Sequence, residues 1–459
     1  MKEITWQPKR LKTAYEAEIA VVGGGTTGVI AAIAAARMGR KTLLIERYGA
    51  LGGTETMALV TPVMPEGAPS GNAESAISKE IRERLTAKGF GHKYEGNYSS
   101  WFDTEMLKVE LEEMVHEAGV HVLFETELVD VVMEGSAIAA LILHNKGGLC
   151  AAVAQQYIDC TGDGDLSVMA GAQYTSGGPN GRNQSVSLRY EMCGVDLARF
   201  GQWLRDNGQT DEWTEPPLIS TYKGGCPGFD KLIAEKVAEG EVTEGDMHYV
   251  QMFTMPGNPT AMNFNCPELG NSENVLDPEF ISDRLYEGKR SIVRCAAFYK
   301  KYVPGFENSS LSKIAPMLGI RESRRIETEY VLTIDDIFAY RKFADGISIS
   351  DYKIDVHGNT KFAALEGKDY DHSLPREQWY FTMPYRSLVV KDVDNLLVAG
   401  RCAGADFFAQ SAIRVQHMCR YMGEAAGIGA AMAVSESVSP KAVDGSAVRA
   451  KMMVLGADL

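Results

Sequence analysis

The chain has 459 residues, of which 45% are hydrophobic and 23% charged, and its formal net charge is −15. This length fits two or three structural units, and the composition is that of an ordinary globular protein. An acidic chain without clustered Lys and Arg is a poor partner for nucleic acid. No apolar run reaches the roughly 20 residues of a membrane span, and residues 1–18 lack the apolar core of a secretion signal. We therefore expect a cytoplasmic protein without a membrane span.

The eight cysteines form no Cys-x-x-Cys pair and no spacing typical of zinc or iron–sulfur ligands. We interpret them as small buried side chains. Neither a metal site nor a paired-thiol redox centre is expected.

The N-terminal segment 18–46 reads as a strand, a glycine-rich turn, a helix and a second strand. The short apolar run 18–22 is typical of a buried parallel strand, and residues 27–38 are apolar on all sides, as in a buried helix. The second strand is expected over 41–45, joined by a right-handed connection.

The rest of the chain contains further predicted elements and one long segment without clear periodicity. The residues between 172 and 385 carry most of the prolines and aromatics and are interpreted as a second, mixed α+β domain. The other predicted elements are, in chain order, a helix over 103–118, strands over 120–124, 128–133, 138–143, 156–159 and 396–400, and a long helix over 411–434.

The turn after the first strand fits the pattern G-x-G-x-x-G, with glycines at 23, 25 and 28. Gly23 allows a tight turn, Gly25 lets the backbone approach a diphosphate, and Gly28 lets the helix pack on the strand. The helix beginning at Thr26 and Thr27 offers free N–H groups to phosphates. Glu46 ends the second strand and is placed to accept hydrogen bonds from ribose hydroxyls.

Two features favour FAD over NAD as the dinucleotide. A second glycine turn, formed by Gly52, Gly53 and Thr54, directly follows the second strand. Near the other end of the chain, a strand into Gly400 precedes the long helix, whose N-terminal amides would face the flavin ring where negative charge collects on reduction.

The motifs taken together resemble those of bacterial FAD-dependent oxidoreductases with the glutathione-reductase type of FAD domain. The matching segments are 21–28, 46–53, 159–165, 319–325, 395–401 and 411–414.

This resemblance implies an α/β fold in which a Rossmann-like FAD domain is split in sequence, over 1–171 and 386–459, by a substrate domain over 172–385. It also implies that Val129 contacts the adenine end through its backbone and that Thr161 and Gly162 lie along the adenosine. The other residues assigned to the cofactor are Arg47, Asp165, Gly400, Arg401, Ser411, Ala412 and Ile413.

Some of these assignments have alternatives. Asp163 and Asp165 lie in a Gly-rich turn, where turn formation and helix capping explain them without chemistry. Arg401 stands where many relatives have the aspartate that holds the ribityl chain, so its contact with the flavin stays open. No second G-x-G-x-x-G unit appears, so the electron acceptor is also open, and a homo-oligomer is compatible with the sequence.

A basic segment supplies the first catalytic candidates. Arg321 or Arg324 would face the flavin and pair with a substrate carboxylate or a developing oxyanion. The alternative is that these arginines and Arg325 form ion pairs with nearby Glu322, Glu327 and Glu329.

Other candidates lie closer to the C-terminus. His357 would take a hydroxyl proton from the substrate, although a lone histidine is more often a surface or capping residue. Arg414 and His417 are three residues apart and would share a helix face, either toward the flavin or in a helix ion pair.

The sequence thus predicts hydride transfer between FAD and a small polar organic molecule, such as a hydroxy acid or a sugar derivative. Two alternatives are a flavin monooxygenase or halogenase, and a non-catalytic protein that FAD holds together.

Overall fold

The computed structural model describes residues 10–64, 73–93, 100–211, 213–358, 365 and 368–459. Half of the segment searched for a secretion signal, residues 1–9, lies outside the described residues. Within those ranges, none of the helices combines the length and apolar character needed to cross a membrane.

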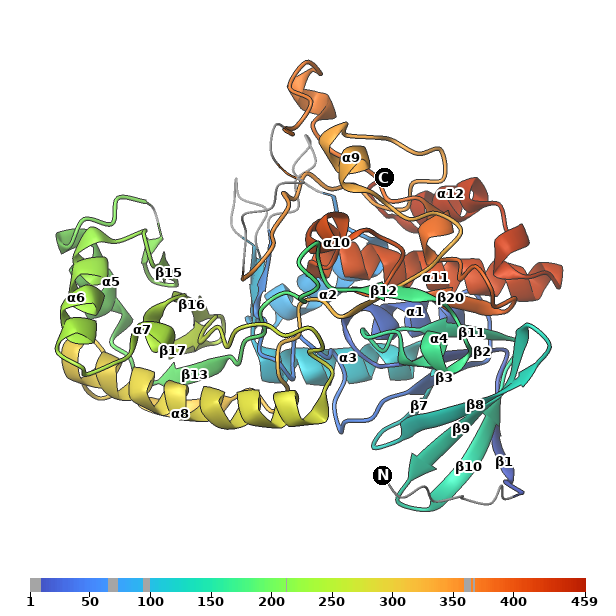
Figure 1. Ribbon diagram of the computed structural model, residues 1–459, viewed down its shortest axis with the longest axis horizontal. Coiled ribbons are helices and arrows are strands. Elements are labelled where there is room, and N and C mark those ends of the chain that lie inside the picture. Colours follow the sequence, from blue (N-terminus) through green and yellow to red (C-terminus); the bar gives the residue numbers. More distant parts are fainter. Residues whose placement is uncertain (1–9, 65–72, 94–99, 212, 359–364, 366–367) are drawn as a thin grey trace.

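A five-stranded parallel sheet forms the centre of one half of the molecule (Figure 1). Its middle strand is apolar on both faces, since Ile19 and Val21 enter one hydrophobic core while Ala20 and Val22 enter another. Successive side chains of a strand point to opposite faces, so a sheet of such strands must be covered on both sides. In spatial order the strands are β20 (Leu396–Val398), β11 (Gln156–Asp159), β2 (Ile19–Val22), β3 (Thr42–Ile45) and β7 (His121–Leu123).

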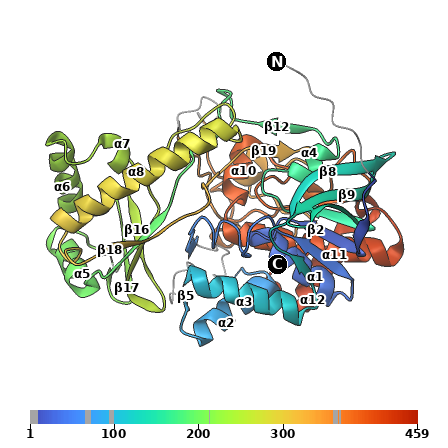
Figure 2. The ribbon, with the colours of Figure 1, turned by 90° about the horizontal axis from the view of Figure 1, so that it is seen from below.

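Helices cover one face of the parallel sheet, and a second sheet covers the other (Figures 1 and 2). The helical layer contains α1 (Thr26–Arg37), α2 (Ala76–Ala87), α3 (Thr104–Glu117), α11 (Gln416–Glu436) and α12 (Gly445–Leu455). The covering sheet consists of β1 (Thr13–Glu16), β10 (Gly148–Val153), β9 (Ala137–Asn145) and β8 (Glu127–Glu134).

The other half of the molecule is built on a six-stranded antiparallel sheet with its own aromatic-rich core (Figure 1). The 25-residue helix α8 (Pro278–Tyr302) lies along this half in both ribbon views. The strands are β14 (Thr214–Glu215), β15 (Leu218–Tyr222), β16 (Gln251–Met255), β17 (Asn258–Phe264), β13 (Tyr190–Cys193) and β18 (Ser310–Ile314). The other helices here are α5 (Leu197–Asp206), α6 (Pro227–Ala238) and α7 (Glu244–Met247).

Short elements connect the two halves. After β18 the chain returns to the first half, where Leu332, Phe381 and Tyr385 join the core of α1 and α11. This return precedes residue 386, where the closing part of the FAD domain is predicted to begin. The remaining elements are β4 (Pro62–Val63), β5 (Gly91–Lys93), β6 (Ser100–Phe102), α4 (Asp165–Met169), β12 (Tyr174–Ser176), β19 (Arg324–Ile326), α9 (Ile334–Phe338), α10 (Phe407–Ile413) and the 3₁₀ turns η2 (Arg376–Gln378), η3 (Tyr385–Leu388) and η4 (Pro440–Ala442).

The predicted α/β class and the sequence-split sheet are confirmed, because β20 pairs in parallel with β11 beside β2. The helix predicted over 103–118 is α3, with Asp103 accepting hydrogen bonds from two first-turn amides. Its buried face includes Leu107, which is fully buried, whereas Val109 is 48% exposed. Leu107 lies four residues before Leu111 and so shares its face, which Val109 does not.

The long helix predicted over 411–434 is two helices, α10 and α11, separated at Arg414 and Val415. Val415 adopts an extended conformation and is the N-cap of α11. The break allows the second helix to start in a new direction. No Gly or Pro marks it, which is why the apolar pattern predicted a continuous helix.

Helices α1 and α11 pack with their backbones in close approach. A Cβ atom at Gly423 would lie 2.4 Å from the carbonyl oxygen of Thr27, and one at Gly427 would lie 2.3 Å from that of Ala31. Gly423 and Gly427 are four residues apart in α11, and Thr27 and Ala31 are four residues apart in α1, so each helix presents one face to the other. Any side chain at these two glycines would push α11 away from α1.

Gly427→Ala should therefore lower the free energy of unfolding by about 1–3 kcal/mol, although alanine favours helix more than glycine does. Gly245→Ala in α7 is the matched control, because the nearest atom to the new methyl group would be 3.7 Å away. Denaturant unfolding should show the control unchanged or slightly stabilised. Equal behaviour of the two variants would contradict this packing.

Candidate functional site

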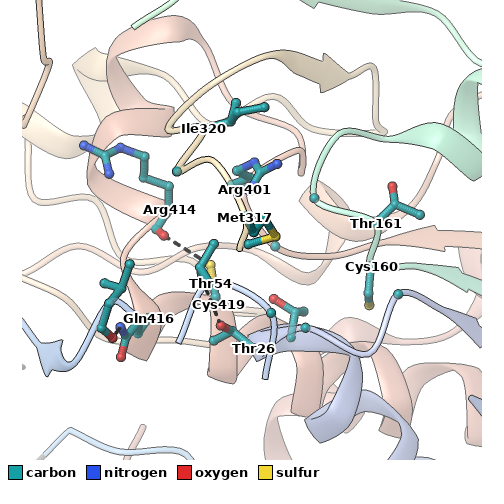
Figure 3. Close-up of a pocket in the computed structure, with 18 of the residues that line it drawn as sticks. Thr26, Thr54, Cys160, Thr161, Met317, Ile320, Arg401, Arg414, Gln416 and Cys419 are labelled. Atoms are coloured by element: carbon teal, nitrogen blue, oxygen red, sulfur yellow. Dashed lines mark hydrogen bonds between the residues drawn. The ribbon is translucent and has the colours of Figure 1, made fainter. Parts of the chain in front are cut away.

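A cavity of about 640 Å³ opens at the carboxyl ends of the parallel strands and extends to the six-stranded sheet (Figure 3). The residues at or just after the ends of β2, β3, β11 and β20 line it, namely Val22, Ile45, Cys160 and Ala399. Ligands of open α/β sheets bind at this edge, where the strand order changes direction. Here the change occurs between β2 and β11, because β3 and β7 follow β2 on one side of the sheet, whereas β11 and β20 lie on the other.

The first glycine turn lines one end of the cavity. Gly23 has a φ of +96°, and a Cβ there would lie 2.5 Å from the carbonyl oxygen of Cys160. A Cβ at Gly28 would lie 1.8 Å from the oxygen of Gly23. At Gly25 the nearest atom to a Cβ, the Cα of Gly53, is 3.7 Å away, an ordinary van der Waals distance. The tight turn at Gly23 and the close packing at Gly28 agree with the sequence pattern, and the approach of a diphosphate to Gly25 stays a prediction.

The second glycine turn closes against the first. Gly52 forms a parallel bridge with Gly25. Gly53 also lies close to Gly25, since a Cβ at Gly53 would be 2.7 Å from the Cα of Gly25. The hydroxyls of Thr26 and Thr54 are 3.3 Å apart across the two turns. Except for Gly52, these residues line the cavity.

Two helices begin at the cavity without a side-chain cap. The N-cap of α1 is Gly25 and that of α11 is Val415, and neither side chain accepts a hydrogen bond. Elsewhere Asp103 and Asp277 cap α3 and α8. Uncapped N-termini present free N–H groups and the positive end of the helix dipole, which suit a diphosphate at α1 and an electron-rich ring at α11.

Glu46 lines the cavity and is 5% exposed. Its carboxylate accepts hydrogen bonds from the backbone N–H groups of Gly24, at 2.7 Å, and Tyr48, at 2.8 Å. Burial raises the pKa of Glu46, against these hydrogen bonds and the charge of Arg47. Each oxygen retains acceptor capacity, as ribose binding requires.

The segment after β11 forms another wall of the cavity. Thr161, Gly162 and Asp165 line the cavity, and the Thr161 hydroxyl accepts a hydrogen bond from the amide of Asp165. The Arg401 guanidinium lies flat against Gly162 and donates to Asp163 at 2.7 Å. Burial and the neighbouring carboxylates raise the pKa of Asp165 to about 6.

Some predicted cofactor residues lie elsewhere. Ser411, Ala412 and Ile413 are buried in the last turn of α10 and do not line the cavity, because the helix breaks after them. Val129 is 41% exposed, and a register shift between Leu128 and Asp130 interrupts the pairing of its strand. The residues of that segment that line the cavity are Thr126, Glu127 and Leu128.

His357 lines the opposite part of the cavity and stands between two carboxylates. Its Nε2 is 3.4 Å from Asp355 and its Nδ1 is 3.9 Å from Glu268. Burial works to raise the pKa of both carboxyl groups, but the neighbouring His357 and arginines hold them low, that of Glu268 at about 2. The ring also packs edge-on against Tyr249, with centroids 5.4 Å apart.

Of the three arginines predicted in the basic segment, only Arg321 lines the cavity. Arg325 forms a buried ion pair with Glu322, one of the partners expected for this segment. Arg324 pairs at 3.1 Å with Asp165, a residue far away in the sequence.

Arg414 lines the cavity, but not for the predicted reason. It ends α10, whereas His417 belongs to α11, so the two do not share a helix face. Arg414 donates to the carboxylate of Asp355 at 3.3 Å. His417 is buried against Ser350, and burial lowers its pKa to about 3.

Several lining residues were not predicted. Arg189 comes from the segment before β13, in which polar and apolar residues alternate from 185 to 192, a signal of a strand with one polar face. Tyr249, Gln251 and Asn265 come from the region of β16 and β17 and are mutually hydrogen-bonded within 3.1 Å. Their contact across 16 residues could not be read from the sequence.

All eight cysteines are free. Cys160 and Cys419 line the cavity, and burial raises the pKa of both thiols, that of Cys419 to about 12. Cys402 is also buried, with a raised pKa of the same cause. Neutral thiols of this kind are packing groups rather than nucleophiles.

Solved structures with a related fold include several flavin enzymes, although no protein of curated function matches the sequence. A geranylgeranyl bacteriochlorophyll reductase-like protein from Thermoplasma acidophilum is 14% identical, with a TM-score of 0.47 over 96% of this chain and 83% of that one. The flavin-dependent brominase Bmp2 is 11% identical (TM-score 0.48; 96% and 83%), and a p-nitrophenol 4-monooxygenase from Pseudomonas putida is 10% identical (TM-score 0.46; 96% and 87%). At these values the similarity does not indicate a substrate.

A sequence model of the family described as FAD dependent oxidoreductase matches residues 18–452. The match includes both glycine turns, the segment after β11 and the helix α11. The fit of the cavity agrees with it, because the glycine cradle and two uncapped helices suit a diphosphate and a flavin ring. The chain therefore belongs to the FAD dependent oxidoreductase family, and its cofactor is FAD.

Proposed function

We propose that the protein transfers a hydride between a carbon atom of a small polar organic substrate and FAD. The observation that carries this proposal is the position of His357, an acid–base group in the same cavity as the glycine cradle. FAD, when bound, supplies the two-electron acceptor or donor that the side chains of the protein lack. The glycine turns and Glu46 would hold its diphosphate and ribose.

The two carboxylates beside His357 support a division of tasks between its ring nitrogens. Glu268 is outside the lining of this cavity and lies 3.9 Å from Nδ1, so this nitrogen would point away from the substrate. The closer carboxylate, Asp355, is 3.4 Å from Nε2 and is shared with Arg414. Asp355 lines the cavity near Nε2, which would therefore face the substrate. Nε2 would take the proton of a substrate hydroxyl as the hydride leaves the adjacent carbon, which becomes a carbonyl.

The reverse reaction uses the same groups, with protonated His357 giving its proton to the substrate. Arg414, held by Asp355, would stabilise negative charge near the N-terminus of α11. Arg324, which faces away into its ion pair with Asp165, would act on the position of that residue rather than on the substrate.

An anaerobic screen of metabolites for bleaching of the bound flavin tests this function. Bleaching by a hydroxyl compound without NAD(P)H or oxygen is the expected result. A requirement for both NAD(P)H and oxygen, with oxygen or halogen inserted into the product, would favour the monooxygenase or halogenase alternative. Failure of every metabolite and of NAD(P)H to bleach the flavin would favour the non-catalytic one.

Glu46→Ala should weaken FAD binding by about 10- to 100-fold, because it removes the ribose acceptor and leaves two backbone N–H groups without their partner. Glu134→Ala, on the exposed end of β8, is the control. Because burial raises the pKa of Glu46, the wild-type affinity should increase as the pH rises above the ordinary value of 4.5. Fluorescence titration of apoprotein with FAD would contradict this role if Glu46→Ala bound as tightly as Glu134→Ala.

His357→Asn should slow flavin reduction by the identified substrate about 10²- to 10⁴-fold, with FAD still bound, because the proton acceptor is lost. His144→Asn, at an exposed position of β9, should behave like the wild type. Stopped-flow absorbance under anaerobic conditions measures both. Near-normal reduction by His357→Asn would remove His357 from the chemistry.

A further inference from the structure

Three arginines line the cavity at the end that contains His357: Arg189, Arg321 and Arg414. The positive charge of Arg414 lowers the pKa of Arg321, and the positive charge of Arg321 lowers the pKa of Arg189. The three guanidinium groups are thus close enough to repel one another. Figure 3 shows Arg414 and Ile320, the neighbour of Arg321, at this side of the cavity.

Only one of the three has an acidic partner at ion-pair distance among the described residues, and that is Arg414, paired with Asp355. The Nη1 atom of Arg189 donates to the backbone oxygen of Leu59 at 3.3 Å, and that of Arg321 to the oxygen of Ser185 at 2.6 Å. These carbonyls orient the guanidinium groups but carry no negative charge.

Both of these arginines are deeply buried, with Arg189 at 7% and Arg321 at 9% exposure. Burial is the main reason why the pKa of each is lowered, that of Arg189 to about 9. A buried charge without an opposite charge is strongly destabilising. An anionic ligand in the cavity would supply the missing negative charge.

The nearby carboxylates supply it only in part, because Glu268 and Asp355 act on Arg321 from beyond ion-pair distance. Asp355 is engaged by Arg414 and faces His357, while Glu268 lies on the far side of His357. Counting the three arginines against these two carboxylates leaves one positive charge, before any proton on His357. The charge balance of this end therefore favours one negative group on the bound molecule.

Neutral polar side chains also line this end. Asn265 donates to both Tyr249 and Gln251, which fixes the three side chains in one network. Ser187 adds a hydroxyl from the same alternating segment as Arg189. Such groups suit a hydroxyl or carbonyl oxygen placed beside the anionic group.

We infer that Arg189 and Arg321 form the binding site for a carboxylate group of the substrate, so that the substrate is a small hydroxy or oxo acid rather than a neutral sugar derivative. This inference rests on the proposed hydride transfer. A planar guanidinium can donate two parallel hydrogen bonds to a carboxylate. The alternative ligand for these two arginines is an anionic group of FAD itself. The hydride would then come from the carbon next to the carboxylate, and the proton taken by His357 would come from the hydroxyl on that carbon.

The test is a titration of the FAD-loaded protein with oxalate, monitored by flavin absorbance at low ionic strength. Oxalate is a dicarboxylate without a C–H bond, so it reports binding and not turnover. Oxamide, its neutral diamide, is the matched ligand. Oxalate should bind and oxamide should bind at least about 10-fold more weakly, as expected for the loss of charge-assisted hydrogen bonds.

Arg189→Gln and Arg321→Gln should each weaken oxalate binding by about 10- to 100-fold while FAD remains bound. Arg199→Gln, which removes an exposed arginine paired with Glu307, should leave it unchanged. Arg189→Lys and Arg321→Lys keep the charge and replace the glutamine variants in this test if those do not fold. Their affinity for oxalate should be below that of the wild type, because lysine cannot donate two parallel hydrogen bonds to a carboxylate.

Equal binding of oxalate and oxamide, or full oxalate affinity in the arginine variants, would overturn the inference. Loss of FAD instead of oxalate would assign the arginines to the cofactor and would also overturn it. If oxalate binds through these arginines but no acid bleaches the flavin, the hydride-transfer proposal fails and the carboxylate site stands. If a neutral compound bleaches the flavin and oxalate does not bind, the reverse holds.

Discussion

The approach of backbone to backbone at a few glycines is the constraint on which the rest of the structure depends. Gly25 and Gly53 bring two turns together, and Gly423 and Gly427 bring α11 against α1. A single methyl group at most of these contacts would separate the segments. Because they meet, the uncapped starts of α1 and α11 open into one cavity. The same contacts that hold the fold together therefore create the cofactor site.

The cavity joins two kinds of chemistry. The end formed by the parallel sheet offers backbone amides and a buried glutamate, groups that recognise a nucleotide without reacting with it. The end formed by residues 187–189, 317–321 and 352–357 offers a histidine, arginines and hydrogen-bonding side chains. Burial strengthens the electrostatic interactions of these groups, because water screens them less. Such an arrangement suits a reaction in which charge develops beside the flavin.

The sequence predicted well what depends on neighbouring residues. The glycine pattern, Glu46 and the segment after β11 were recognised from short stretches of sequence, and residues of all three line the cavity. It failed where a local irregularity carries no sequence signal, as at Val415, where an extended residue divides the predicted helix. Val129, whose backbone contact with the cofactor stays a prediction, lies beside an irregularity of strand pairing.

It also failed where distant segments meet. Arg324 finds its partner 159 residues away, so the acidic residues beside it in the sequence were poor guides. Arg189 was missed because its significance lies in what surrounds it in space, and its alternating segment marks only a strand. His357 was a catalytic candidate with a surface or capping role as its alternative, and the positions of Asp355 and Glu268 beside its ring are visible only in three dimensions.

A crystal structure of the protein with FAD bound would test the account most directly. The account places the diphosphate at the start of α1, between the two glycine turns, and the flavin ring at the start of α11, with His357 and Arg321 left open to a substrate on the far side of the ring. A ring that covers the arginines and separates His357 from the cavity, or a diphosphate bound away from Gly25, would contradict it.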